Sequence, residues 1–272
     1  MIITKKDLEY LFKDRSQKEA FLRVDFGQKF LPVKIEKKGI MVKGGYFIDF
    51  NTKLKDNFCY LLRKRKGLLP VAFFSDDTNK FYKLLPSKDW PSVTVGSVSM
   101  HRLKIVSPKE DTERKIRLIK PYGVVLDTCM GLGYTAILSS YTAKRVYTFE
   151  IDRNIYFIAK INPLSKKLFE RDNIVIKIGD IYKLVTRFKD DFFDCIIHDP
   201  PTFKLAPLLY SEGFYNQLKR VLKRKGRLFH YLPFYGIKRG RDFPQEIREK
   251  LKDVGFKIIV VSYEDGGIVC QK

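Results

Sequence analysis

Cysteine and long apolar runs are scarce in this chain of 272 residues, and acidic residues are few relative to basic ones. Its four cysteines form no Cys-x-x-Cys pair, which argues against a disulfide framework or a zinc site, so we expect reduced thiols and no bound metal. No apolar run reaches about 18 residues, so we expect no membrane span. The N-terminal residues lack an apolar signal core, which favours a cytoplasmic location.

The excess of basic over acidic residues gives the chain a strong positive charge. Lys and Arg number 53 against 31 Asp and Glu, which gives a net charge of +22. A chain this basic concentrates polyanions around itself. Proteins from hot environments can also be rich in lysine, but they usually gain Glu along with Lys. Because the acids lag behind here, the charge favours a nucleic-acid partner.

The first part of the chain, residues 1–105, reads as a small α+β domain. Thr4 can cap a helix that starts at Lys5 and extends to about Phe21. Glycines then separate short apolar runs that predict strands at 30–35, 40–42, 46–50, 70–74 and 93–95. We assign this domain to RNA binding.

The second part, residues 106–272, alternates strands and helices. Ser107, Pro108 and Glu110 form a capping box with proline at the first helical position, which predicts a helix over 108–119. Apolar runs without alternation are typical of strands buried on both faces. Strands are expected at 124–127, 146–150, 174–178, 195–199, 227–232 and 257–261, and helices at 134–141, 213–222 and 245–251. This order predicts a doubly wound sheet in an α/β domain.

Three acidic residues fall at the ends of the first three strands of this sheet. Asp127 ends the first strand, and Gly131 and Gly133 follow it in a turn that lets the backbone approach a ligand. Glu150 lies 19 residues after Gly131 and can accept hydrogen bonds from both hydroxyls of a ribose. Asp180, 30 residues further, can accept from the amine of an adenine.

Acids in register suit a cationic ligand rather than a pyrophosphate. No Gly-x-x-x-x-Gly-Lys-Ser/Thr motif is present, so a P-loop is excluded. A dinucleotide-binding dehydrogenase remains formally open, although Cys129 stands where such folds usually have their first glycine.

From about Glu110 onward, these residues resemble the class I methyltransferases that use S-adenosyl-L-methionine. The resemblance implies a Rossmann-like sheet of seven strands that ends in an antiparallel hairpin, with the last strand at 268–271. It implies that Asp127 and the glycine turn hold the methionine part of the cofactor. It also implies that Glu150 holds the ribose and Asp180 the adenine. The cofactor-binding residues implied in this way are Asp127, Thr128, Gly131, Gly133, Tyr134, Glu150, Ile151, Asp180 and Ile181.

The fourth strand ends in Asp199, Pro200 and Pro201. An exocyclic amine on an aromatic base must become more tetrahedral before it can attack a methyl group. Asp199 can accept one N–H of that amine and the carbonyl of Pro200 the other, which favours the attacking geometry. The two prolines fix that carbonyl in place, and Phe203 could stack on the target. We therefore predict Asp199, Pro200, Pro201 and Phe203 as the catalytic residues.

This Asp-Pro-Pro resembles the motif of nitrogen methyltransferases that act on bases or on glutamine. The C-terminal pattern, including Asp242, Phe243 and Pro244, is similar to an archaeal group of predicted RNA methyltransferases. The resemblance implies an RNA substrate, with ribosomal RNA favoured over tRNA and cytidine N4 as the target. Alternatives are a tRNA guanosine N2-methyltransferase, a protein glutamine methyltransferase, an enzyme like a polyamine aminopropyltransferase, and a non-enzymatic RNA-binding protein.

The remaining polar residues give weaker indications. We interpret His198 as structural because it should point away from Asp199, whereas His101 and His230 could each touch a ligand. Basic runs and nearby aromatic residues are candidates for RNA contacts, although core packing is the more common use of such aromatics. The basic runs are Arg63 to Lys66, Lys219 to Lys225, and Lys238, Arg239 and Arg241, and the aromatics are Tyr60, Phe73, Phe74, Phe81 and Tyr82.

Overall fold

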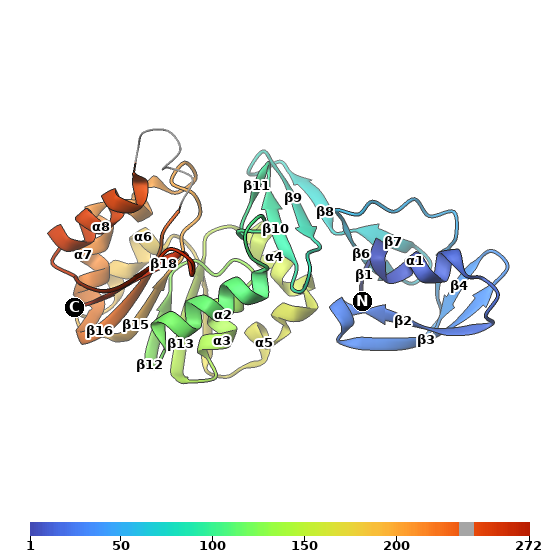
Figure 1. Ribbon diagram of the computed structural model, residues 1–272, viewed down its shortest axis with the longest axis horizontal. Coiled ribbons are helices and arrows are strands. Elements are labelled where there is room, and N and C mark those ends of the chain that lie inside the picture. The colour runs from blue at the N-terminus through green and yellow to red at the C-terminus, as the bar shows by residue number, and fades with distance from the viewer. Residues whose placement is uncertain (234–241) are drawn as a thin grey trace. The chain divides into compact units, whose positions relative to one another are not determined.

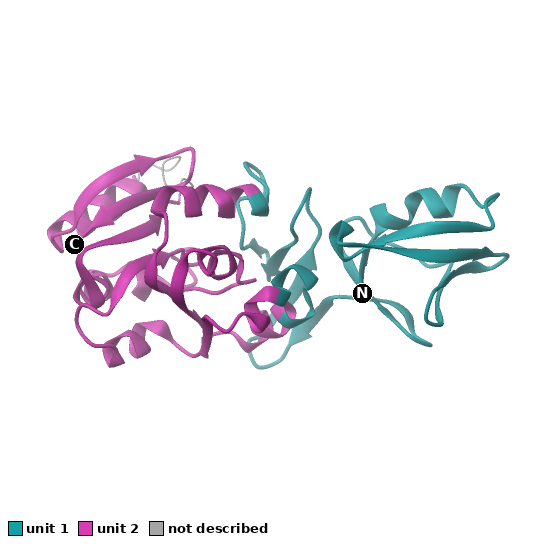
Figure 2. Cartoon of the chain, turned by 90° about the horizontal axis from the view of Figure 1, so that it is seen from below, with its two compact units in different colours: residues 1–109, 160–166 teal, residues 110–159, 167–272 magenta. Residues whose placement is uncertain are grey.

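The computed structural model describes residues 1–233 and 242–272, which form two compact units (Figure 2). Unit 1 comprises residues 1–109 and 160–166, and unit 2 comprises 110–159 and 167–272. The division therefore falls four residues after the boundary expected at 105, and a short later segment joins unit 1. The basic run at Lys238, Arg239 and Arg241 lies outside the described residues. No described helix combines the length and the apolar character that crossing a membrane would need.

Unit 1 contains one α-helix and three antiparallel sheets. The helix is α1 (Lys5–Lys13), and it lies along one face of the first sheet (Figure 1). That sheet has the strand order β2 (Glu19–Val24), β3 (Lys29–Glu36), β4 (Gly39–Val42) and β5 (Tyr46–Asp49). The second has the order β1 (Ile2–Thr4), β6 (Cys59–Arg63) and β7 (Gly67–Pro70), and the third β11 (Val98–Ser99), β10 (Ser92–Val95), β9 (Lys80–Leu85) and β8 (Ala72–Ser75).

The helix expected to reach Phe21 ends at Lys13. Asp14 accepts hydrogen bonds from the backbone and hydroxyl of Ser16 and so forms a turn at that point. From Glu19 the chain follows a period of two, with Leu22 and Val24 buried in the core that α1 covers. Over this short stretch the apolar pattern is compatible with the helical period of 3.6 and with the strand period of two, and pairing with β3 selects the strand.

Unit 2 is the seven-stranded α/β sheet that the sequence predicts. Its strand order is β14 (Ile174–Ile178), β13 (Ala143–Glu150), β12 (Gly123–Asp127), β15 (Phe193–His198), β16 (Leu222–Tyr231), β18 (Gly267–Gln271) and β17 (Lys257–Ser262). The first five strands are parallel, and β18 is antiparallel to both of its neighbours. The order reverses direction at β12, so the carboxyl ends of β12 and β15 flank a topological switch point.

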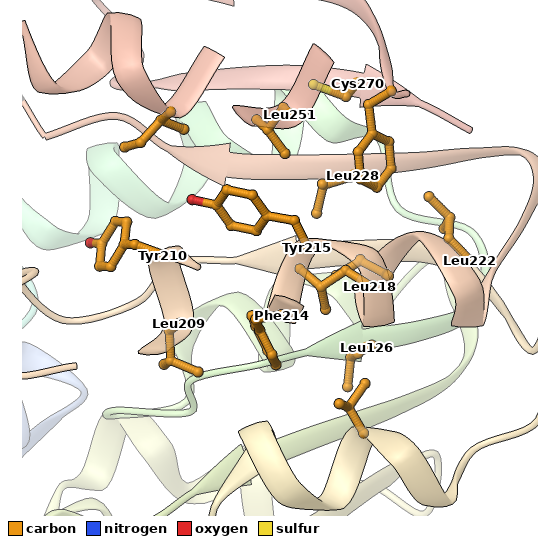
Figure 3. Close-up of a cluster of buried hydrophobic side chains, with 14 of the residues drawn as sticks. Leu126, Leu209, Tyr210, Phe214, Tyr215, Leu218, Leu222, Leu228, Leu251 and Cys270 are labelled. Atoms are coloured by element: carbon orange, nitrogen blue, oxygen red, sulfur yellow. The ribbon is translucent and has the colours of Figure 1, made fainter. Parts of the chain in front are cut away.

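The helices of unit 2 cover its sheet. They are α2 (Pro108–Ile119), α3 (Tyr134–Ser139), α4 (Arg153–Ile161), α5 (Lys166–Glu170), α6 (Ile181–Leu184), α7 (Glu212–Val221) and α8 (Phe243–Asp253), of which α2, α4 and α5 have residues in both units. One face of the sheet packs against α6, α7 and α8 through side chains that include Leu126, Phe214 and Leu251 (Figure 3). The helix expected over 213–222 ends at Val221, and β16 begins directly at Leu222.

Candidate functional site

The carboxyl ends of the parallel strands bring four acidic residues to one edge of the sheet. In the register of the sheet, Asp127 of β12 lies opposite Thr148 of β13 and Ile197 of β15. Glu150 and Asp199 each follow those partners by two residues, and Asp180 follows the end of β14. The spacing of acids in the sequence therefore corresponds to neighbouring positions in space.

The turn after β12 leaves room for a ligand at one glycine and not at the other. Gly131 has φ +54°, and a Cβ placed there would meet no atom within 4 Å. Gly133 has φ +79°, and a Cβ there would lie 2.4 Å from Leu168 Cδ2 of α5. Both positions need glycine for its left-handed backbone. Gly133 is also required by packing, whereas the space beside Gly131 is open to a ligand.

Glu150 is fixed in place by backbone amides. Its Oε2 accepts from Gly131 N at 3.0 Å and its Oε1 from Asp152 N at 2.9 Å. Burial raises the pKa of Glu150 to about 7, against the lowering effect of these backbone hydrogen bonds. Each carboxylate oxygen retains a lone pair, so a half-buried Glu150 can still accept from a ligand hydroxyl.

Asp127 and Thr128 lie deeper than the sequence reasoning supposed. Asp127 is fully buried, and its oxygens accept from Thr148 Oγ1 at 2.6 Å and Thr135 Oγ1 at 3.2 Å. Burial raises its pKa to about 7, the two hydroxyls oppose that shift, and the charges of Asp199 and Glu150 add to it. The Thr128 hydroxyl is buried against His198 Nδ1 at 2.8 Å. The side chain of Asp127 therefore connects β12 to the first residues of α3 and to β13, on either side of the glycine turn.

The residues expected around the adenine divide into two kinds. Asp180 caps α6 by accepting from Tyr182 N at 3.0 Å and is half-buried. Ile151, directly after Glu150, is 66% exposed and so is available to an apolar ring. Ile181 is buried in the core beneath α6, and Tyr134 is buried at the start of α3, so neither of these two side chains faces solvent.

Asp199 has a buried lysine as its partner, which the sequence reasoning missed. Lys115 Nζ of α2 lies 2.6 Å from Asp199 Oδ2 and 2.7 Å from Asp111 Oδ2. The same Nζ lies 5.5 Å from the centre of the Tyr231 ring at the end of β16. Burial is the largest single effect on the pKa of Lys115 and lowers it, but the carboxylates of Asp199 and Asp111 together outweigh burial and raise that pKa. Asp111, one helical turn before Lys115, was a signal in the sequence for their own pair, since acid and base at i and i+4 share a helix face, but it did not indicate Asp199.

The Pro200–Pro201 turn rests on a second residue that was missed. The Tyr210 hydroxyl donates to Pro201 O at 2.9 Å and lies 3.4 Å from Pro200 O. Phe203 is half-buried, with its ring centre 5.8 Å from that of Tyr210 and 5.3 Å from that of Phe243. Tyr210 is the residue labelled at the edge of the cluster in Figure 3. The hydroxyl of Tyr210 thus holds the turn in place. The side chain of Asp199 remains 26% exposed.

The histidines of unit 2 are structural. His198 Nε2 lies 2.9 Å from Leu209 O, so it donates there and Nδ1 accepts from Thr128. His230 Nδ1 lies 2.6 Å from Tyr231 O and its Nε2 accepts from Tyr215. Burial lowers the pKa of His230 to about 4 and that of His198 well below its ordinary value. Both rings are buried, so the ligand contact considered for His230 does not occur through its ring.

The basic runs differ in what they do. Arg63, Lys64, Arg65 and Lys66 are exposed at the β6–β7 hairpin. By contrast, Lys219, Arg220 and Lys223 bind groups of unit 2, among them Val254 O, Asp190 and Asp194. Of the candidate aromatics, Tyr60 and Tyr82 are core residues, whereas Phe74 and Phe81 pair across β8 and β9 and are exposed. In unit 1, His101 Nδ1 lies 2.8 Å from Ser92 Oγ.

Comparison with known proteins gives one sequence relative and a shared fold. No protein-family model matches the chain. The uncharacterized protein MJ1233 of Methanocaldococcus jannaschii is 39% identical over 278 residues, which cover 99% of this chain and 95% of that protein. A spermidine synthase solved with the transition state analogue AdoDATO matches 75% of each chain with a TM-score of 0.56 at 17% identity. The spermidine synthase of Thermotoga maritima matches 75% of this chain and 74% of its own with a TM-score of 0.52 at 18% identity.

Proposed function

The chain belongs to the same family as the archaeal protein MJ1233, and we propose that it transfers a methyl group from S-adenosyl-L-methionine to an exocyclic amine of a base in structured RNA. The observation that carries this proposal is the position of Asp199. It follows β15, the neighbour of β12, and so lies on the strand next to the glycine turn and its open space at Gly131. Lys115 binds Oδ2 of Asp199, and within the described residues Oδ1 has no hydrogen-bond partner.

The residues at the sheet edge fit the cofactor. The open space at Gly131 suits its methionine part, Glu150 would hold the ribose, and Asp180 with Ile151 would hold the adenine. Asp127 and Glu150 lie close enough for their charges to interact, which favours a cationic ligand. The bound cofactor would supply a methyl group on a positively charged sulfur.

Asp199 would act on the acceptor amine by hydrogen bonding. An N–H that donates to Oδ1 holds the nitrogen with its lone pair directed at the methyl carbon. The bond between the methyl carbon and sulfur would break as the bond to the amine nitrogen forms, the sulfur would leave with the electron pair as a neutral thioether, and the proton would pass from the positively charged nitrogen to water. The Pro200–Pro201 turn, held by Tyr210, keeps Asp199 in position during this displacement.

We further propose cytidine N4 of ribosomal RNA as the target. The Asp-Pro-Pro motif supports an amine target, and the net charge of +22 supports a polyanionic substrate. Aminopropyl transfer to a polyamine is a second candidate, because spermidine synthases share the fold over three quarters of the chain. The charge of the chain disfavours that candidate, since a polyamine is itself a cation.

Parallel transfer assays test these proposals. Purified protein is incubated with tritiated S-adenosyl-L-methionine and, in separate reactions, with ribosomal RNA, with tRNA or with a protein extract, each from a strain lacking the gene. A further reaction contains an aminopropyl donor and putrescine. We expect label in ribosomal RNA, in a nucleoside that mass spectrometry identifies as N4-methylated cytidine. Transfer to putrescine, to protein or to tRNA alone would contradict the proposal.

Asp199→Ala is the matched variant. It should lower turnover on the order of 10²–10⁴-fold, comparable with the loss of one polar catalytic group, while cofactor affinity stays within a few-fold. Asp172→Ala, at an exposed acid before β14, is the control and should leave turnover unchanged. Turnover of Asp199→Ala near that of the wild type would contradict the mechanism.

A further inference from the structure

Lys115 is a buried cation on the carboxylate that faces the acceptor. It is 5% exposed and reaches Asp199 from helix α2, 84 positions earlier in the chain. Its ammonium group contacts two carboxylates at 2.6 and 2.7 Å and lies over the ring of Tyr231. Three elements, α2, β15 and β16, therefore meet at one charged atom.

Burying this group of three charges is not a favourable way to stabilise a fold, which points to a functional reason for it. Removing an ammonium and two carboxylates from water carries a large desolvation penalty, and a hydrophobic replacement is often at least as stable. Only Oδ2 of Asp199 is used by the lysine, and the side chain keeps 26% of its surface exposed. The lysine thus fixes the rotamer of Asp199 while leaving its second oxygen to a ligand.

We infer that Lys115 is a positioning residue that orients Asp199 toward the acceptor nitrogen and restricts the acceptor to neutral amines. An amine that donates to Oδ1 shares one carboxylate with the ammonium of Lys115. A neutral aromatic amine meets no repulsion there, whereas a protonated alkylamine would place a second positive charge beside the first. The inference rests on the proposed function, since it takes Asp199 as the group that faces the acceptor.

The same geometry bears on the choice between the two candidate functions. Because the carboxylate of Asp199 already has a cation of its own, its attraction for a polyamine is reduced. Asp111 does not restore that attraction, because its Oδ2 is bound to the same Nζ and its side chain is buried. The target side of the site therefore favours an uncharged amine, such as that of a nucleobase.

The test separates the positive charge from the fold. Lys115→Met alone would leave two carboxylates without their cation, so the informative variant is the double substitution Lys115→Met with Asp111→Asn, which keeps the net charge of the three residues at its wild-type value. Lys115→Arg retains the cation with a different shape. Arg117→Met removes one exposed charge from the same helix and serves as the control.

We expect kcat of the double variant on RNA to fall about 100-fold, with KM for RNA and Kd for the cofactor within threefold of the wild type. Lys115→Arg should recover part of that loss, and Arg117→Met should match the wild type. Wild-type turnover in the double variant would overturn the inference. Parallel loss of cofactor binding and of the melting transition would overturn it too, because Lys115 would then only hold the fold. If the wild type itself transfers no methyl group to RNA, the proposed function fails instead.

Discussion

At the scale of single residues, the acids at the sheet edge have different environments and therefore different uses. Asp127 is enclosed by two threonine hydroxyls, Glu150 by backbone amides, and Asp199 is paired with Lys115. Burial raises the pKa values of both Asp127 and Glu150 to about 7. In the absence of a cationic ligand these two acids hold their protons more tightly than in the unfolded chain.

Asp127→Asn should change how stability depends on pH. The ordinary pKa of an aspartate is about 4, so between about pH 4 and pH 7 the folded protein keeps a proton that the unfolded chain has lost. Stability therefore falls as pH rises through that window, at most on the order of 4 kcal/mol for one group. The asparagine can accept from Thr148 and donate to Thr135 and does not titrate.

Urea denaturation at pH 5 and pH 8 measures this effect. The free energy of unfolding of the wild type should drop between the two values, and that of Asp127→Asn should drop less. Glu150 retains its own share of the drop in both proteins. Parallel pH dependences in the two proteins would show that Asp127 does not carry the raised pKa.

Single residues also mark the limit of what the sequence could predict. Glu150, Asp180 and Asp199 were predictable because parallel strands end at one edge, so an acid after each apolar run must fall there. The pairing of Asp199 with Lys115 was not predictable, because no local pattern links positions 84 apart. The burial of Asp127 was missed for a related reason, since it depends on two threonines supplied by α3 and β13.

At the scale of elements, the turn between β12 and α3 offers a paired test. Gly131→Ala adds a methyl group to open space and costs only the left-handed backbone strain of roughly 1–2 kcal/mol. Gly133→Ala carries the same strain and also drives Cβ into Leu168 of α5, which adds roughly 1–3 kcal/mol of overpacking. Thermal melts should therefore rank Gly133→Ala as the less stable variant.

Cofactor binding should rank the two variants in the opposite order. In Gly131→Ala the added methyl group occupies the proposed methionine space, so Kd from calorimetry should rise by a factor of ten or more. Gly133→Ala combined with Leu168→Ala relieves the clash and should bind the cofactor more tightly than Gly131→Ala does. An unchanged Kd in Gly131→Ala would place the ligand elsewhere on the sheet edge.

Helices and strands were predictable where the apolar residues followed the pattern of only one of the two. The strands of unit 2 appear as apolar runs because both faces of the sheet are covered, and their positions agree with the sequence to within a few residues, except that β16 begins five residues early. The N-terminal helix was too long because the apolar pattern over 5–21 did not show that the chain turns at Asp14 and pairs with β3. Tertiary pairing decided that stretch.

At the scale of the whole molecule, the positive charge is divided between structure and surface. Arg220 and Lys223 are paired with Asp190 and Asp194, so part of the second basic run is used within unit 2. The β6–β7 hairpin instead presents Arg63, Lys64, Arg65 and Lys66 to solvent. If unit 1 contacts RNA, this hairpin is the basic run that is available for it.

Salt dependence of RNA binding tests that assignment. Each phosphate that a lysine or arginine neutralises contributes about −0.7 to −0.9 to the slope of log K against log salt. Replacing Arg63, Lys64, Arg65 and Lys66 with glutamine should make the slope shallower by up to about 3.6. Affinity at low salt should fall as well, while the melting temperature stays near that of the wild type because the four side chains are exposed.

Lys144→Gln with Arg145→Gln is the control for that variant. These two residues are exposed near the start of β13, at the end of the strand opposite to Glu150, so they lie away from the edge where the site is built. Their replacement should leave the slope unchanged, because the slope counts phosphates in direct contact with basic side chains and these two side chains are not expected to touch RNA. Equal changes of slope per charge in the two variants would mean that RNA responds to the net charge of the molecule and not to the hairpin. A wild-type slope near zero would exclude a polyanionic partner for either surface.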